Sequence, residues 1–206
     1  MSSRSRLFAL LLAAAAAAPA APLRAADTYT IDKAHTDASF RIRHFATKVR
    51  GRFSQLEGAI QADTAQPSLS TVTFTIKSAS IDTNNPDRDK HLQSPDFFDA
   101  SKCPDITFTS SKVTPAGKDK YEVAGTLTMH CVAKPVTIPV TFLGFAKDPG
   151  GNERASFEVV TKLNRKDFGI NWNKTLDAGG VMLSDDVDVE INLETVKKKP
   201  EAATAK

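Results

Sequence analysis

The chain has 206 residues, of which 41% are hydrophobic, and its 27 lysine and arginine residues stand against 24 aspartate and glutamate residues. Arg4, Arg6 and Arg24 lie in the first 25 residues, where no acidic residue occurs, so the rest of the chain carries 24 groups of each sign and no net charge. That balance argues against a nucleic-acid-binding protein, and two cysteines exclude both a scaffold held by several disulfides and a zinc site of four cysteines.

The first 25 residues have the layout of a secretory signal peptide. Met1 to Arg6 is basic, Leu7 to Ala18 is an unbroken apolar run of 12 residues, and cleavage is expected after Ala25 or Ala26. Twelve helical residues span about 18 Å, which is too short for the ~30 Å core of a bilayer. We therefore predict a periplasmic protein that is not an integral membrane protein, with a signal peptide at 1–25, one domain at 26–196 and a disordered polar tail at 197–206.

Apolar and polar residues alternate along much of the domain, which is the period of a strand with one buried face. The alternation predicts strands over residues 38–44, 71–77, 106–109, 121–130, 136–142, 157–163 and 186–193. Gly58 and Gly125 lie in strand-like segments, where glycine often marks a bulge or a bend. Residues 115–119 and 148–152 have the composition of hairpin loops, and the second loop predicts that 134–146 and 154–165 pair antiparallel.

One region breaks this pattern. Asn85 is suited to cap a helix that starts at Pro86, and Asp87 complements the positive end of that helix. Ser94 to Asp96 repeats the signal, so one or two short helices are expected within 86–99. Eight or nine strands with no long helix indicate an all-β protein, either a closed antiparallel barrel or a sandwich, and a barrel of about eight strands can hold one small ligand.

Motifs of catalysis are absent from the sequence. It contains no Gly-x-Ser-x-Gly elbow, no phosphate-binding loop, no dinucleotide-binding glycine pattern and no His-Glu-x-x-His. The four histidines at 35, 44, 91 and 130 have no spacing typical of metal ligands, and the aspartates near 87–99 are explained by helix capping. We expect neither catalytic residues nor a metal site, and hence a protein that is not an enzyme.

Six segments of the domain, in order along the chain, resemble the YceI-like family. They are TYTIDKAHT at 28–36, VRGRF at 49–53, RDKHLQSPDFFD at 88–99, GTLTMHCVAKPV at 125–136, NRKDFGI at 164–170 and LDAGGVMLSDDV at 176–187. The resemblance implies a bacterial, commonly periplasmic protein with a lipocalin-like antiparallel barrel. It also implies that a long amphiphile, such as a polyisoprenoid, a polyprenyl quinone or a fatty-acid derivative, binds inside the barrel.

On this resemblance the inward-facing apolar residues are expected to line a ligand cavity. The alternation by itself indicates only a phenylalanine-rich interior, which would equally suit a packed core. The expected lining residues are Phe40, Ile42, Phe53, Phe74, Ile76, Phe108, Leu127, Met129, Phe142, Phe157 and Val159. Phe168 and Trp172, with Phe97 and Phe98, are expected at the mouth, and His44 and Arg165 are candidates to contact the ligand head group.

The function predicted from the sequence is a periplasmic binding or carrier protein for such an amphiphile, with no cofactor apart from a bound isoprenoid or quinone as ligand and with no nucleic-acid partner. Two alternatives remain at this point. One is a structural or interaction module with a packed barrel core, and the other is a quinone-linked redox partner of a membrane cytochrome. The oligomeric state is not predicted.

Cys103 and Cys131 stand where the YceI-like family usually has an aromatic residue and a glycine. Because the periplasm is oxidising and the hairpin turn near Gly117 brings the two positions close together, we predict a disulfide between them. The strand register leaves Cys103 and Cys131 opposed or one step apart, depending on a bulge near Ser110 and Ser111. Two buried free thiols are the alternative.

Overall fold

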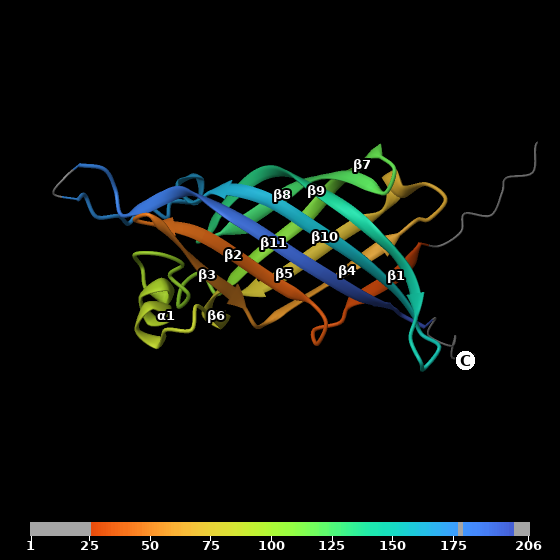
Figure 1. Ribbon diagram of the computed structural model, residues 1–206. Coiled ribbons are helices and arrows are strands. Elements are labelled where there is room, and N and C mark those ends of the chain that lie inside the picture. The colour runs from red at the N-terminus through yellow and green to blue at the C-terminus, as the bar shows by residue number, and fades with distance from the viewer. Residues whose placement is uncertain (1–25, 177–178, 200–206) are drawn as a thin grey trace, which may run out of the picture.

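A computed structural model describes residues 26–176 and 179–199 of the chain (Figure 1). Its strands are β1 (Asp27–Ile31), β2 (Asp37–His44), β3 (Thr47–Phe53), β4 (Leu56–Ala62), β5 (Thr71–Lys77), β6 (Ile81–Asp82), β7 (Asp105–Gly117), β8 (Lys120–Met129), β9 (Val132–Lys147), β10 (Glu153–Asn164) and β11 (Leu183–Lys197). Its helical segments are η1 (Pro67–Leu69), η2 (Ser78–Ser80), α1 (Pro86–Gln93) and η3 (Arg165–Phe168). The predicted signal peptide and most of the predicted tail lie outside the described residues.

Eight of these strands close into an antiparallel barrel. The hydrogen-bonded order β1-β4-β5-β7-β8-β9-β10-β11 returns to its start because β11 also pairs with β1, where Tyr29 lies opposite Lys197. The other edge of the sheet continues from β11 through β2 and β3 to the short β6. The predicted closed barrel of about eight strands is confirmed. No helix in the described residues is long and apolar enough to span a bilayer.

Strands β1 and β2 lie one after the other along the same edge of β11. Residues 195–197 of β11 pair with β1, and residues 183–192 pair with β2. The next strands in the sheet are β3, which pairs with β2, and β4, which pairs with β1. Strands β2 and β3 form one end of the barrel, and in the view of Figure 1 helix α1 lies below them. This end therefore carries the irregular segments that surround the site described below.

The seven strands predicted from alternation are all present, and β1, β3, β4 and the short β6 lie outside the ranges that alternation predicted. Two of the missed strands have glycine at an inward position, which interrupts the apolar alternation. A Cβ on Gly51 of β3 would lie 2.4 Å from Cζ of Phe40, and one on Gly58 of β4 would lie 2.4 Å from the carbonyl oxygen of Thr73. The backbone of β5 therefore requires glycine at position 58, whereas at position 51 the Phe40 ring fills the space that a Cβ would take. The bulge considered at Gly58 is absent, since β4 pairs with β5 without a register shift.

The prediction of one or two short helices within 86–99 is confirmed, with one helix present. The side chain of Asn85 accepts a hydrogen bond from the amide of Arg88, and Pro86 opens α1. Residues 94–99 form a turn instead of a second helix, in which Phe97 N donates to Ser94 O at 3.0 Å. The predicted antiparallel neighbours are also found, with Val140 to Lys147 of β9 paired against Glu153 to Val159 of β10.

The predicted disulfide is present. Cys103 and Cys131 are bonded, with their Cα atoms 5.3 Å apart. Phe108 pairs with Leu127, and the register shifts between Ser110 and Lys112, where a bulge was expected. The disulfide ties the segment that follows α1 to the turn between β8 and β9.

Strand β11 extends further than the predicted domain boundary at residue 196. Lys197 is its last residue, and its Nζ lies 2.7 Å from Oδ2 of Asp27. Lys197, the first residue of the predicted polar tail, is therefore part of a barrel strand, where it pairs with Tyr29 of β1.

Candidate functional site

The interior of the barrel holds two adjoining cavities. The first, which we call the α1 cavity, has a volume of about 280 Å³ and is bordered by Leu92 of α1 and by Phe97 and Phe98. The second, the η1 cavity, has a volume of about 400 Å³ and is bordered by Pro67 of η1. Both are lined by the same seven residues at their junction: Phe53, Ile76, Ile106, Met129, Leu163, Val189 and Ile191. The two cavities can therefore serve as one elongated compartment, within the size range of ligand pockets.

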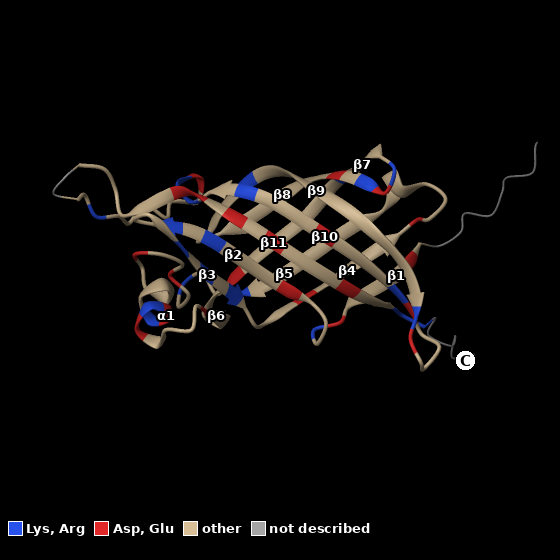
Figure 2. Cartoon of the chain, viewed as in Figure 1, with Lys and Arg blue, Asp and Glu red and all other residues tan. Residues whose placement is uncertain are grey.

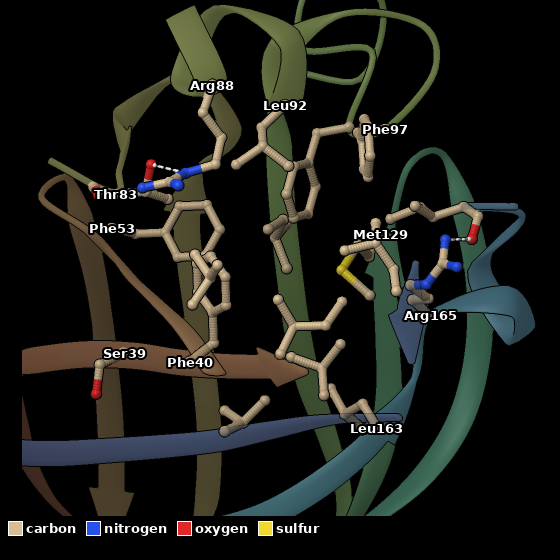
Figure 3. A pocket seen from close by; sticks show the side chains of 18 of the residues that line it. Ser39, Phe40, Phe53, Thr83, Arg88, Leu92, Phe97, Met129, Leu163 and Arg165 are labelled. Carbon is tan, nitrogen blue, oxygen red and sulfur yellow. Dashed lines mark hydrogen bonds between the residues drawn. The ribbon is translucent and has the colours of Figure 1, made fainter. Parts of the chain in front are cut away.

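Aromatic side chains close the α1 cavity on two sides (Figure 3). The ring of Phe53 lies 5.8 Å from that of Phe40 and 5.7 Å from that of Phe98, measured between centroids. At the outer end, the Trp172 ring lies 5.0 Å from His91 and 5.2 Å from Phe97. These contacts join α1 and the turn after it to the loop that precedes β11, so the apolar mouth is assembled from segments distant in the sequence.

The η1 cavity is also walled mainly by aromatic and aliphatic side chains. Phe74, Phe108 and Leu127 come from β5, β7 and β8, and the rings of Phe142 and Phe157 lie 5.4 Å apart on β9 and β10. Such a lining offers dispersion contacts and exclusion of water over its whole length, which suits a hydrocarbon chain.

Arg165, in contrast, is a buried cation at the edge of the α1 cavity, with 4% of its side chain exposed. Its guanidinium donates to the backbone carbonyl oxygens of Ile170 at 2.9 Å, Trp172 at 2.8 Å and Ser184 at 3.0 Å. Burial lowers the pKa of Arg165, and the Asp185 carboxylate, 3.6 Å from Nη2, opposes that shift. These contacts fix the loop that carries Trp172, so we interpret Arg165 as a residue that holds the mouth together.

Sixteen of the seventeen residues expected in the cavity or at its mouth line the cavities, Phe97 and Phe98 among them. Phe40, Ile42, His44, Arg165 and Trp172 border the α1 cavity; Phe74, Phe108, Leu127, Phe142, Phe157 and Val159 border the η1 cavity; and Phe53, Ile76 and Met129 border both. Phe168 borders neither, because it is buried in the core, 2% exposed. Its carbonyl oxygen lies 3.0 Å from Nδ1 of His130. That these residues contact a ligand stays a prediction.

Sequence reasoning missed Arg88 and Thr83 as lining residues of the α1 cavity. Arg88 was attributed to the start of a helix, and the alternation pattern gives no signal for an inward-facing side chain on a helix of 8 residues. The RDKH segment at 88–91, noted for its resemblance to the YceI-like family, was the available signal.

Basic and acidic residues are interspersed along the strands of the barrel (Figure 2). One group surrounds Arg154, whose guanidinium pairs with Asp32 at 2.6 Å, with Glu194 and with Asp148 at 3.2 Å. Hydrogen bonds from Arg154 and His35 lower the pKa of Asp32 to about 2. Asp32, His35 and Glu194 place three potential metal-ligand atoms within 4.8 Å of one another, but Arg154 already supplies a positive charge to both carboxylates.

Comparison with known proteins gives consistent matches over the domain. The sequence profile of the YceI-like domain matches residues 29–195. A UPF0312 protein of Pseudomonas fluorescens is 41% identical over 94% of this chain and 98% of its own length, and one of Vibrio cholerae is 38% identical over 95% and 100%.

Solved structures share the fold. The YCEI protein of Campylobacter jejuni is 37% identical, with a TM-score of 0.66, over 83% of this chain and 98% of its own. BcnA of Burkholderia cenocepacia is 27% identical, with a TM-score of 0.69, over 80% and 98%. A polyisoprenoid-binding domain of Saccharophagus degradans, at 16% identity and a TM-score of 0.64 over 85% and 100%, is similar in fold.

Proposed function

The chain belongs to the YceI-like family, and on this basis and that of its two adjoining apolar cavities we propose that it binds a long-chain amphiphile inside the barrel. The observation that carries the proposal is the junction, where seven apolar residues border both cavities and so form one compartment for a chain. A polyisoprenoid is the first candidate for the ligand. A domain of the same fold is described as polyisoprenoid-binding.

Solvent exclusion supplies the affinity in this proposal. A methylene group transferred from water into the apolar interior contributes about 0.8 kcal/mol, so ten such groups contribute about 8 kcal/mol before the cost of ordering the chain is subtracted. That corresponds to binding on a micromolar scale. Because the described residues that line the cavities are mainly apolar, the role we propose is binding or carriage of the ligand.

We place this function in the periplasm. The Cys103–Cys131 disulfide supports an oxidising compartment, and the signal-like sequence at 1–25 supports export. A polyprenyl quinone remains a candidate ligand, and with it a role as redox partner of a membrane cytochrome. The alternative of a packed structural module is less favoured, since a packed core would fill the cavities of about 280 and 400 Å³.

The direct test is to purify the protein from the periplasm, extract it with organic solvent and analyse it by native mass spectrometry before and after extraction. We expect a mass excess that disappears on extraction and a lipid in the extract. Protein that carries no lipid, and whose melting temperature does not change when isoprenoids or fatty acids are added, would contradict the proposal.

A further inference from the structure

Arg88 brings a positive charge to the wall of the α1 cavity. It lies in the first turn of α1, is half-buried, and borders the cavity together with Thr83 (Figure 3). Its Nε donates to Oγ1 of Thr83 at 2.7 Å, and its Nη2 donates to the Thr83 carbonyl oxygen at 2.7 Å. Both contacts are with neutral oxygen atoms.

Each of the other charged or titratable side chains at this cavity contacts a carboxylate or an aromatic ring. Arg165 faces Asp185, His91 lies 3.0 Å from the carboxylate of Asp96, and the ring of His44 packs edge-on against Phe45. Within the described part of the chain, Arg88 is the arginine of this cavity that forms no ion pair with a carboxylate. A cation beside apolar lining is costly unless a counter-charge meets it.

Thr83 holds the Arg88 guanidinium in a fixed orientation. Thr83 is buried, 5% exposed, and both its amide and its hydroxyl donate to the Asp89 carboxylate, the amide at 2.9 Å. The hydroxyl thus accepts from Arg88 and donates to Asp89, so it lies between the two charges. One edge of the guanidinium is used in this way, and Nη1 has no hydrogen bond among the described residues. A guanidinium held by one edge is preorganised to donate to an anion with its remaining hydrogens.

The surroundings of Arg88 suit the head of an amphiphile. Phe40, Phe53 and Leu92 border the cavity beside it (Figure 3). Gly51 keeps this corner compact, because a Cβ there would lie 2.9 Å from Cγ2 of Thr83 as well as 2.4 Å from the Phe40 ring. A chain that starts at Arg88 can continue through the junction toward the η1 cavity.

We propose that Arg88 binds the anionic head group, a carboxylate or a phosphate, of the amphiphile whose chain occupies the two cavities. This inference rests on the proposed function and narrows it to acidic lipids: fatty acids or isoprenyl phosphates. An anionic head group neutralises the charge of Arg88 at the apolar wall. The carbonyl oxygens of a quinone can accept hydrogen bonds from Arg88, but they do not neutralise its charge.

The test compares lipids that share a chain and differ in the head group. Binding is measured by displacement of a fluorescent fatty-acid probe for oleate against oleyl alcohol, and for geranylgeranyl monophosphate against geranylgeraniol. Wild-type protein is expected to prefer the acidic member of at least one pair by about 10- to 100-fold, as for hydrogen bonds to a charged group. The pair that shows the preference distinguishes a carboxylate from a phosphate.

Arg88→Met keeps most of the side-chain length and removes the charge, so the preference for the acidic member of the pair is expected to disappear. Arg50→Met is the matched control. Arg50 is exposed on β3, pairs with Arg41 of β2, and is not among the residues that line the α1 cavity. Circular dichroism and melting temperature check the fold, and Arg88→Gln, which retains hydrogen-bond donors, replaces Arg88→Met if the latter unfolds.

Two results separate this inference from the proposed function. Equal affinity of wild-type protein for both members of both pairs, or an undiminished preference in the Arg88 variants, would overturn the assignment of the head group to Arg88 while the lipid-binding proposal stands. Failure of all four lipids to bind wild-type protein would overturn the lipid-binding proposal itself.

Discussion

Replacing Val189 with phenylalanine narrows the passage between the two cavities. Val189 lies on β11, borders both cavities and pairs with Phe40 of β2, so a larger ring there projects into the junction. The η1 cavity, about 400 Å³ against about 280 Å³ for the α1 cavity, then becomes inaccessible to a chain that enters from the α1 side. Overpacking at this position is expected to cost about 1–3 kcal/mol of folding stability.

The expected loss of affinity depends on chain length. Each methylene excluded from the apolar interior costs about 0.8 kcal/mol, so about five excluded methylenes weaken binding by about 4 kcal/mol, or about a thousandfold. Dissociation constants are measured for saturated fatty acids from octanoate to stearate. In wild-type protein the affinity rises along the series, and in Val189→Phe the rise stops at the chain length that fills the α1 cavity.

Val160→Phe is the matched control for this series. Val160 lies on β10 and is 57% exposed, so the same substitution there leaves the cavities unchanged. A Val189→Phe protein that remains folded and shows the wild-type dependence on chain length would refute the idea of a continuous compartment.

Three further perturbations test the fold around the cavities. Because the disulfide joins residues 28 apart, Cys103→Ser with Cys131→Ser should lower the free energy of unfolding by about 3.5 kcal/mol at most, and unchanged urea denaturation would contradict this. The hydrogen bond from Arg154 holds the pKa of Asp32 at about 2, below its ordinary value of 3.8, so Asp32 stabilises the fold above about pH 4 and this contribution is lost as pH falls toward 2. Asp32→Asn should therefore cost about 1–2 kcal/mol at pH 7 and much less near pH 2, and a constant difference between urea melts at the two pH values would contradict the assignment. Phe108→Ala should cost about 3–5 kcal/mol, since Phe108 is 7% exposed, and a loss below about 1 kcal/mol in calorimetry would indicate that its ring is not packed against the barrel wall.

Alternation of apolar and polar residues identified strands wherever the inward side chain is large. Residues 71–77 and 157–163 fall in this group, because burial of one face imposes a period of two on the sequence itself. The cap at Asn85 and the cysteine pair were likewise recognisable, since local hydrogen bonding and a single possible intrachain pairing depend little on the rest of the fold.

Strands β3 and β4 escaped that reasoning for a tertiary reason. At inward position 58 the backbone of the neighbouring strand leaves no room for a Cβ, and at inward position 51 the Phe40 ring occupies that space, and both constraints exist only once the strands are paired. The place of Arg88 at the cavity wall was missed for a similar reason. Its place at the cavity wall depends on how α1 packs beneath β2 and β3, which the composition of a short helix does not encode.

The sequence by itself therefore determined which residues face inward along most strands, and that these residues are apolar. It could not distinguish a filled core from a cavity, because the same inward phenylalanines satisfy both. The tertiary structure decided that question through closure of the barrel: β1 pairs with β11, about 165 residues further along the chain, and fixes a circumference of eight strands. A barrel of eight strands can be filled by its side chains or can hold a ligand, so the decision lies in how these side chains pack, and here they leave cavities of about 280 and 400 Å³.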